Sequence, residues 1–168
     1  MSKIQVLVGM IASGKSTYAK NAARKGHLCM NDDAIVNLLH ADDYTLYNKS
    51  LKVLYKTIEN QIIGTTLAMG RAILIDRGLN CSPQGRQRWI ALARSFDVDC
   101  EAIVFPYDGI ETHARRRAEH DSRGHPYEYW LKVAKAHSES YGDPATFEGF
   151  TAIHRITFDE IKEGKVFP

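Results

Sequence analysis

Apolar residues follow two alternating patterns along the chain. Short apolar runs, typical of strands buried on both faces, are separated by stretches in which apolar residues recur every three or four positions, as on one side of a helix. This alternation predicts an α/β fold whose parallel sheet has about five strands. We expect the strands at residues 4–8, 27–30, 72–76, 99–105 and 152–158.

Turn and capping residues set the limits of the expected helices. Gly26 and Gly70 stop the helices before them, Asn31 and the two aspartates after it can cap another, and Pro126 suits a first helical turn. The pattern predicts helices over 15–24, 32–39, 44–69, 110–119 and 126–141, and one around Trp89.

The first strand and the first helix are joined by the segment GMIASGKS, residues 9–16, which satisfies the pattern G-x-x-x-x-G-K-S. Glycines at these places let the backbone wrap around phosphate oxygens, the lysine adds charge to the β and γ phosphates, and the serine hydroxyl ligates Mg²⁺. The position between a strand and a helix disfavours the alternative, a chance glycine-rich turn. The residues expected to hold the nucleotide are Gly9, Ala12, Ser13, Gly14, Lys15, Ser16 and Thr17, with Ser16 also on the metal.

This loop predicts a P-loop NTPase, a three-layer αβα sandwich, that uses ATP and Mg²⁺. ATP is favoured over GTP because the sequence has no guanine signature of the form Asn/Thr-Lys-x-Asp. The length of 168 residues leads us to expect one domain over residues 1–168. No apolar run approaches the roughly 20 residues that cross a bilayer, so we expect a cytoplasmic protein without a membrane partner. A net charge of +2 does not by itself indicate nucleic-acid binding.

Four further segments match a known family when they are taken together with the loop. They are Asp32-Asp33 after the second strand, residues 75–80 at the end of the third, the arginine-rich residues 115–123, and residues 144–150. In order and spacing the chain resembles the polynucleotide 5′-hydroxyl kinases and the zeta-toxin-like P-loop kinases, over about residues 4–157. The resemblance implies transfer of the γ-phosphate of ATP to the 5′-hydroxyl of DNA or RNA.

The resemblance also implies roles for acidic and polar residues after the second and third strands. Asp32 corresponds to the general base that accepts the proton of the attacking hydroxyl, the alternative being a helix cap. Asp76 is expected to hold Mg²⁺ or to touch the acceptor. Asn80 either orients the acceptor or bonds to the loop backbone, and Arg86 either reaches acceptor phosphates or is solvated.

The arginine-rich segment falls where these kinases carry a helical lid. Arg123 matches the lid arginine that stabilises charge on the transferring phosphoryl group, and Arg117 matches an earlier arginine that contacts the nucleotide. The alternative is a solvated basic helix. The nearby histidines, His113 among them, have no regular metal-ligand spacing, and we do not expect zinc.

Two departures from the family leave the acceptor open. The family's common Asn-Arg-Asp is replaced by Met30-Asn31-Asp32. A member of the family also has an arginine three residues beyond that aspartate, used on the acceptor's phosphate, and here that position is Ile35. These losses favour a second hypothesis, a kinase for a small hydroxyl-bearing metabolite such as a nucleoside. A third is an ATP-binding or ATP-hydrolysing accessory protein. Tyrosines such as Tyr44 and Tyr47 could stack on a base, although packing is the commoner role of such residues. The oligomeric state cannot be predicted from this sequence.

Overall fold

The computed structural model of the chain describes residues 2–121 and 124–168. In this part of the chain, five parallel strands form one sheet in the order β2-β3-β1-β4-β5. Their bounds are Lys3–Val8 (β1), Leu28–Asn31 (β2), Ile73–Asp76 (β3), Asp99–Val104 (β4) and Ala152–Arg155 (β5). The predicted parallel sheet of a P-loop NTPase is therefore confirmed.

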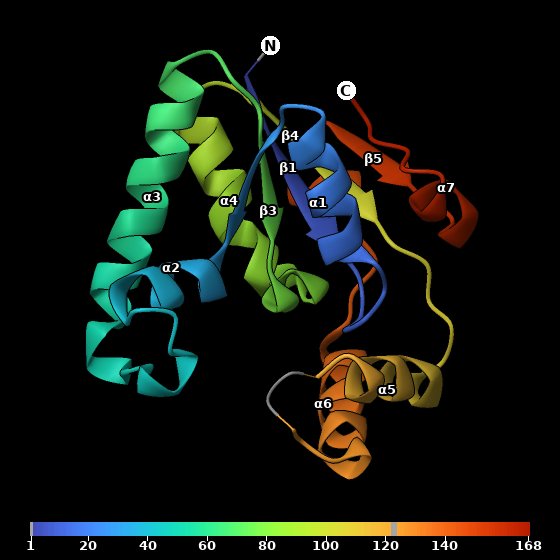
Figure 1. Cartoon of the computed structure of the whole chain (residues 1–168). Coiled ribbons are helices and arrows are strands. Elements are labelled where there is room, and N and C mark those ends of the chain that lie inside the picture. The colour runs from blue at the N-terminus through green and yellow to red at the C-terminus, as the bar shows by residue number, and fades with distance from the viewer. Residues whose placement is uncertain (1, 122–123) are drawn as a thin grey trace.

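Helices cover both faces of the sheet (Figure 1). They are α1 (Lys15–Arg24), α2 (Asp32–Leu39), α3 (Lys52–Ala68), α4 (Pro83–Ser95), α5 (Ile110–Glu119), α6 (Tyr127–Ser140) and α7 (Phe158–Lys162). None of these helices combines the length and the apolarity needed to span a membrane.

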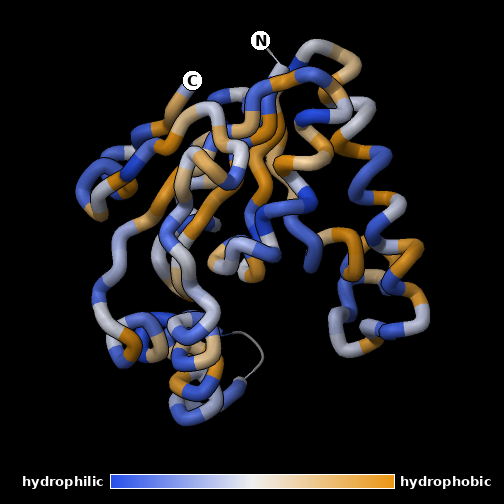
Figure 2. The backbone as a smooth tube through the Cα atoms, turned by 180° about the vertical axis from the view of Figure 1, so that it is seen from behind, coloured by the Kyte–Doolittle hydropathy of each residue, from blue (hydrophilic) through white to orange (hydrophobic). Residues whose placement is uncertain are grey.

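Alternate side chains of the strands point to the two helical layers. Ile4 and Val6 of β1 pack with residues of α3 and α4, whereas Leu7 packs with residues of α1 and α7. Burial on both faces explains why the strands read as continuous apolar runs. Hydrophobic residues accordingly gather on the central strands in Figure 2.

The helix expected over residues 44–69 is wrong in its first part. Two short 3₁₀ turns, Tyr44–Leu46 and Lys49–Leu51, precede α3. Asp43 accepts a hydrogen bond from the backbone N–H of Thr45, and Asn48 accepts one from that of Ser50. Such side-chain bonds offer the backbone an alternative to a continuous helix.

Helices α5 and α6 lie below the carboxyl ends of the strands in Figure 1, at the predicted place of the lid, and we call them the lid helices. They pack on each other through Ala114, Trp130 and Ala134. Met10 of the phosphate loop is buried in the same cluster. The lid helices are therefore in direct contact with the loop.

Candidate active site

The loop between β1 and α1 is folded tightly enough to require its two glycines. A Cβ atom at Gly9 would lie 2.7 Å from the hydroxyl oxygen of Ser13 and 2.8 Å from Cβ of Phe105. Gly14 has a φ of 99°, in the left-handed region that side chains disfavour. Ala12 also has a positive φ, 49°, which costs a non-glycine residue free energy. The backbone thus forms the curved turn expected of a phosphate loop.

Lys15 is folded back onto this loop. Its ammonium donates to the carbonyl oxygens of Gly9, at 2.8 Å, and Met10, at 2.5 Å, and lies 3.4 Å from the Ser13 hydroxyl. Burial lowers the pKa of Lys15 to about 8, although the charge of Asp76 opposes that change. The lysine is held inside the loop by contacts that an anionic phosphate could replace.

Ser16 and Asp76 bring two oxygen donors together beside the loop. The Ser16 hydroxyl donates to Asp76 Oδ2 at 2.9 Å, from the start of α1 to the end of β3. Hydroxyl and carboxylate oxygens suit Mg²⁺, which takes few protein ligands when phosphates supply others. The described residues contain no cluster of three or more His, Cys, Asp or Glu side chains that could hold a metal on its own.

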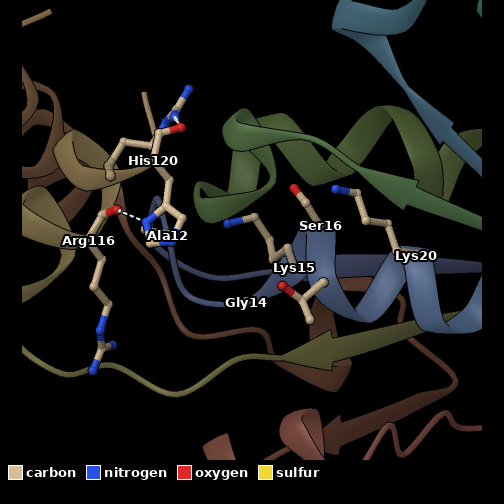
Figure 3. A pocket seen from close by; sticks show the side chains of 9 residues that line it. Ala12, Gly14, Lys15, Ser16, Lys20, Arg116 and His120 are labelled. Carbon is tan, nitrogen blue, oxygen red and sulfur yellow. Dashed lines mark hydrogen bonds between the residues drawn. The ribbon is translucent and has the colours of Figure 1, made fainter. Parts of the chain in front are cut away.

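A cavity of about 540 Å³ lies between the loop with the start of α1 and the end of α5 (Figure 3). Its volume is in the range of small-molecule sites. Cations from both sides line it, which suits a polyphosphate. The lining residues are Ala12, Gly14, Lys15, Ser16, Thr17, Lys20, Arg116, Arg117 and His120.

The lid arginines make different contacts. Arg116 pairs with Asp108 at 2.5 Å and lies over the ring of Phe158, and in Figure 3 it extends away from Lys15. Arg117 lies over the ring of Trp130 and donates to the carbonyl oxygen of His120 at 3.3 Å. The expected lid arginine, Arg123, lies outside the described residues.

Asp32 lies next to the end of β3. The last pair of residues in the β2–β3 register is Asn31 and Asp76. Asp32 and Arg77 are the next residues along the two strands, so they are neighbours as well. Arg77 Nε is 2.6 Å from Asp32 Oδ2, without the angle of a hydrogen bond. Burial raises the pKa of Asp32 and the charge of Arg77 opposes that rise. The side chain that caps α2 is Asn31, which accepts from the Asp33 N–H at 2.9 Å, so Asp32 is not the cap.

A second cavity, of about 310 Å³, opens beside Asp32. Acidic, basic and aromatic side chains share its walls. The lining residues are Asp32, Asp33, Val36, Tyr44, Tyr47, Lys52, Tyr55, Lys56, Glu59, Arg77 and Leu79. We call it the acceptor cavity, because it adjoins the carboxylate expected to activate a hydroxyl.

Two expected acceptor contacts, Asn80 and Arg86, need correction. Asn80 is fully buried; its amide donates to the carbonyl oxygens of Leu7 and Ile75, and its oxygen accepts from Trp89. The side chain of Arg86 is also fully buried, and its guanidinium makes a two-point contact with Glu148 at 3.0 and 2.7 Å. Buried, hydrogen-bonded groups of this kind hold the structure together and do not reach a ligand.

Sequence reasoning missed two residues near the site. The sequence analysis includes Arg77 only as part of the segment 75–80. Its ion pair with Asp32 depends on the register of the strands. His137 of α6 was not singled out, yet burial and the charge of Lys15 both lower its pKa. A Cβ atom at Gly78 would lie 3.5 Å from His137 Cε1, so α6 reaches the turn after β3. A lone histidine on a helix carries no local signal for such an approach.

The fold and the loop define a P-loop kinase-like domain, and this fold supports nucleotide binding. The chain matches the AAA_33 family, described as an AAA domain, over residues 4–144, and it belongs to that family. Among curated proteins the comparison finds no match.

Solved structures with the same fold include kinases for different acceptors. A gluconokinase from Sinorhizobium meliloti 1021 is 12% identical, with a TM-score of 0.57 and coverage of 96% of this chain and 89% of that one. A fungal RNA kinase is 16% identical, with a TM-score of 0.60 and coverage of 93% and 38%. A chain of the Pnkp1/Rnl/Hen1 RNA repair complex is 20% identical, with a TM-score of 0.65 and coverage of 84% and 46%. This chain thus spans less than half of the latter two, and at these identities the likeness is one of fold.

Proposed function

We propose that the protein is an ATP- and Mg²⁺-dependent kinase that phosphorylates the 5′-hydroxyl of a DNA or RNA strand. The observation that carries the proposal is the position of Asp32. Asp32 is one residue past Asn31, which pairs with Asp76 in the sheet. It lines a cavity separate from the one at the phosphate loop. A nucleotide site beside a second site with a candidate base is what a phosphotransferase needs.

On the nucleotide side, the chain supplies backbone N–H groups, cations and oxygen ligands. Lys15 would leave the loop carbonyls for the β and γ phosphates, and Arg117 would add charge from the lid. Ser16 and Asp76 are the residues that would hold Mg²⁺, which when bound neutralises charge on the phosphates. These groups position the γ-phosphate and stabilise the charge that spreads over its oxygens.

On the acceptor side, Asp32 would orient the hydroxyl and take its proton. The hydroxyl oxygen forms a bond to the γ-phosphorus while the bond from that phosphorus to the bridging oxygen breaks, and ADP leaves. Arg77 holds Asp32 in place and favours its charged form. A carboxylate fixed in this way meets the modest demands of phosphoryl transfer for a base.

The missing family arginine bears on the choice of acceptor. Ile35 is buried and packs with Val36 and Tyr55, so this position faces the protein interior. Lys52 and Lys56 line the acceptor cavity and supply positive charge from α3 instead. The aromatic lining of the cavity suits the terminal nucleoside of a strand, and the volume of about 310 Å³ also suits the alternative, a single nucleoside.

A labelled-phosphate assay tests the proposed function. The protein is incubated with Mg²⁺, γ-labelled ATP and a panel of 5′-hydroxyl DNA and RNA oligonucleotides, nucleosides and sugar acids. We expect label on the oligonucleotides. Labelling of nucleosides or sugar acids alone would replace the proposal by the small-metabolite kinase, and release of label only as inorganic phosphate would indicate an ATPase.

For Asp32→Asn we expect kcat to fall by roughly 10²-fold or more, with the affinity for ATP almost unchanged, because only the proton acceptor is lost. In the unmodified protein, kcat/KM for the acceptor should rise with pH as Asp32 deprotonates, with a midpoint above the ordinary carboxyl pKa of 3.8. The variant should lack that rise. Steady-state rates across pH measure both effects.

Asp159→Asn, an exposed aspartate of α7, is the matched control and should behave like the unmodified protein. An Asp32→Asn variant with unchanged kcat would remove Asp32 from the chemistry.

A further inference from the structure

A short segment before α3 is fixed so that it presents tyrosines to the acceptor cavity. The Tyr55 hydroxyl accepts from the backbone N–H of Asn48 at 3.3 Å and lies 2.9 Å from Nε2 of His40. The two 3₁₀ turns on either side of Asn48 are closed by side-chain caps. Tyr55 of α3 therefore ties the segment at Asn48 to His40, the residue that follows α2.

Three tyrosine rings follow one another along this wall. The rings of Tyr44 and Tyr47 are 13° from parallel with centroids 6.1 Å apart, and those of Tyr47 and Tyr55 are 28° from parallel at 5.6 Å. Tyr55 is 5% exposed, so it acts as a backing, whereas Tyr47 is 39% exposed. Tyr47 thus stacks with both neighbouring rings, and part of its aromatic surface stays exposed.

The charges around the acceptor cavity nearly balance. Three cations, Lys52, Lys56 and Arg77, and three acids, Asp32, Asp33 and Glu59, line the cavity, and Glu59 is also paired with Arg88. Arg77 is held on Asp32, and the two lysines are exposed, where water and salt screen their attraction for an anion. The cavity therefore attracts an acceptor phosphate only weakly.

We propose that this site holds its acceptor by the terminal base, which stacks on Tyr47, more than by the adjacent phosphate. The inference rests on the proposed function, since it concerns the acceptor of that reaction. Aromatic side chains bind any base through its ring face, and Tyr47 lines the same cavity as Asp32. Stacking would bring the 5′-hydroxyl of that nucleoside to the carboxylate. A sugar acid has no ring face to use this wall.

Four small acceptors, each with a free 5′-hydroxyl, separate the contribution of the base to binding from that of the phosphate. They are a deoxynucleoside 3′-phosphate, the deoxynucleoside, the abasic 1,2-dideoxyribose 3-phosphate, and 1,2-dideoxyribose. Dissociation constants are measured by NMR titration with Mg²⁺ and a non-hydrolysable ATP analogue. We expect removal of the base to weaken binding roughly 5- to 150-fold, the range for stacking, and removal of the phosphate to weaken it less than about threefold.

Variants of Tyr47 test whether its ring supplies the contribution of the base to binding. Tyr47→Ala should bind all four compounds as the unmodified protein binds the abasic ones, whereas Tyr47→Phe should keep the difference. Phe147→Ala, an aromatic residue that is 91% exposed and does not line the cavity, is the matched control. Base-bearing compounds should also shift the ring signals of Tyr47, which a purely structural role would leave unmoved.

The inference fails if loss of the phosphate costs more than loss of the base, if Tyr47→Ala retains the preference for the base, or if none of the four compounds binds. Equal phosphorylation of an oligonucleotide with and without the base of its 5′-terminal nucleotide would overturn this inference and leave the proposed function in place. Tyr47-dependent binding of base-bearing compounds without any transfer would support the aromatic subsite and overturn the kinase function.

Discussion

We expect Lys15→Ala to lose phosphoryl transfer, by roughly 10³-fold or more in kcat/KM, while the domain stays folded. In the structure Lys15 is 7% exposed and its ammonium is bonded to loop carbonyls. Burial of a charge costs free energy, as the lowered pKa of about 8 indicates. Removal of the ammonium therefore costs the fold little, but the phosphates lose the charge that offsets their own.

Transfer of label from γ-labelled ATP and a thermal melt measure the two halves of this prediction. Lys162→Ala, which removes an exposed lysine of α7, is the matched control and should leave both unchanged. Turnover in a folded Lys15→Ala variant would mean that the loop does not act as the phosphate cradle.

Arg86→Met should destabilise the protein strongly. The variant leaves Glu148 buried without its partner, and also leaves three backbone carbonyl oxygens without the Nη1 donor, those of Asn80, Cys81 and Gly142. Removal of one member of a buried ion pair costs about 3–5 kcal/mol in the free energy of unfolding. For a chain of this size that lowers Tm on the order of 10 °C.

Thermal unfolding of Arg86→Met and of the double variant Arg86→Met/Glu148→Leu tests this account. The double variant should recover part of the loss, because no unpaired charge remains buried. If Arg86 contacted the acceptor instead, the single variant would raise KM for the acceptor and leave Tm where it was.

Local sequence signals sufficed for much of the fold. The helices over 15–24 and 110–119 match the structure, because glycine stops and apolar periodicity act within a few residues. Helix α7 was missed, and its first residue, Phe158, was expected to be the last residue of the fifth strand. Its signal was present, since Thr157 and Glu160 form a capping box, with a threonine followed three residues later by a glutamate.

The contacts of Asn80 and Arg86 could not be predicted in the same way. Arg86 pairs with a glutamate 62 positions away, and Asn80 bonds to a strand 73 positions earlier. A polar residue at a strand end or on a helix can contact either a ligand or the protein interior. Its partner in the tertiary structure decides between the two, and no local sequence pattern encodes that partner. Asp32 and Asp76 differ in this respect, because Asp32 follows β2 and Asp76 ends the neighbouring β3, and the carboxyl ends of parallel strands meet at one edge of the sheet.

The shared cluster of Met10, Ala114, Trp130 and Ala134 has a consequence for how the molecule opens. Since the loop and the lid helices bury apolar surface against each other, partial unfolding of one exposes the other. This small cluster is separate from the two clusters that cover the sheet, so it can lose its order while the sheet stays intact. Backbone amides of the loop and of α5 and α6 should then exchange their hydrogens as one cooperative unit, with less protection than the central strands.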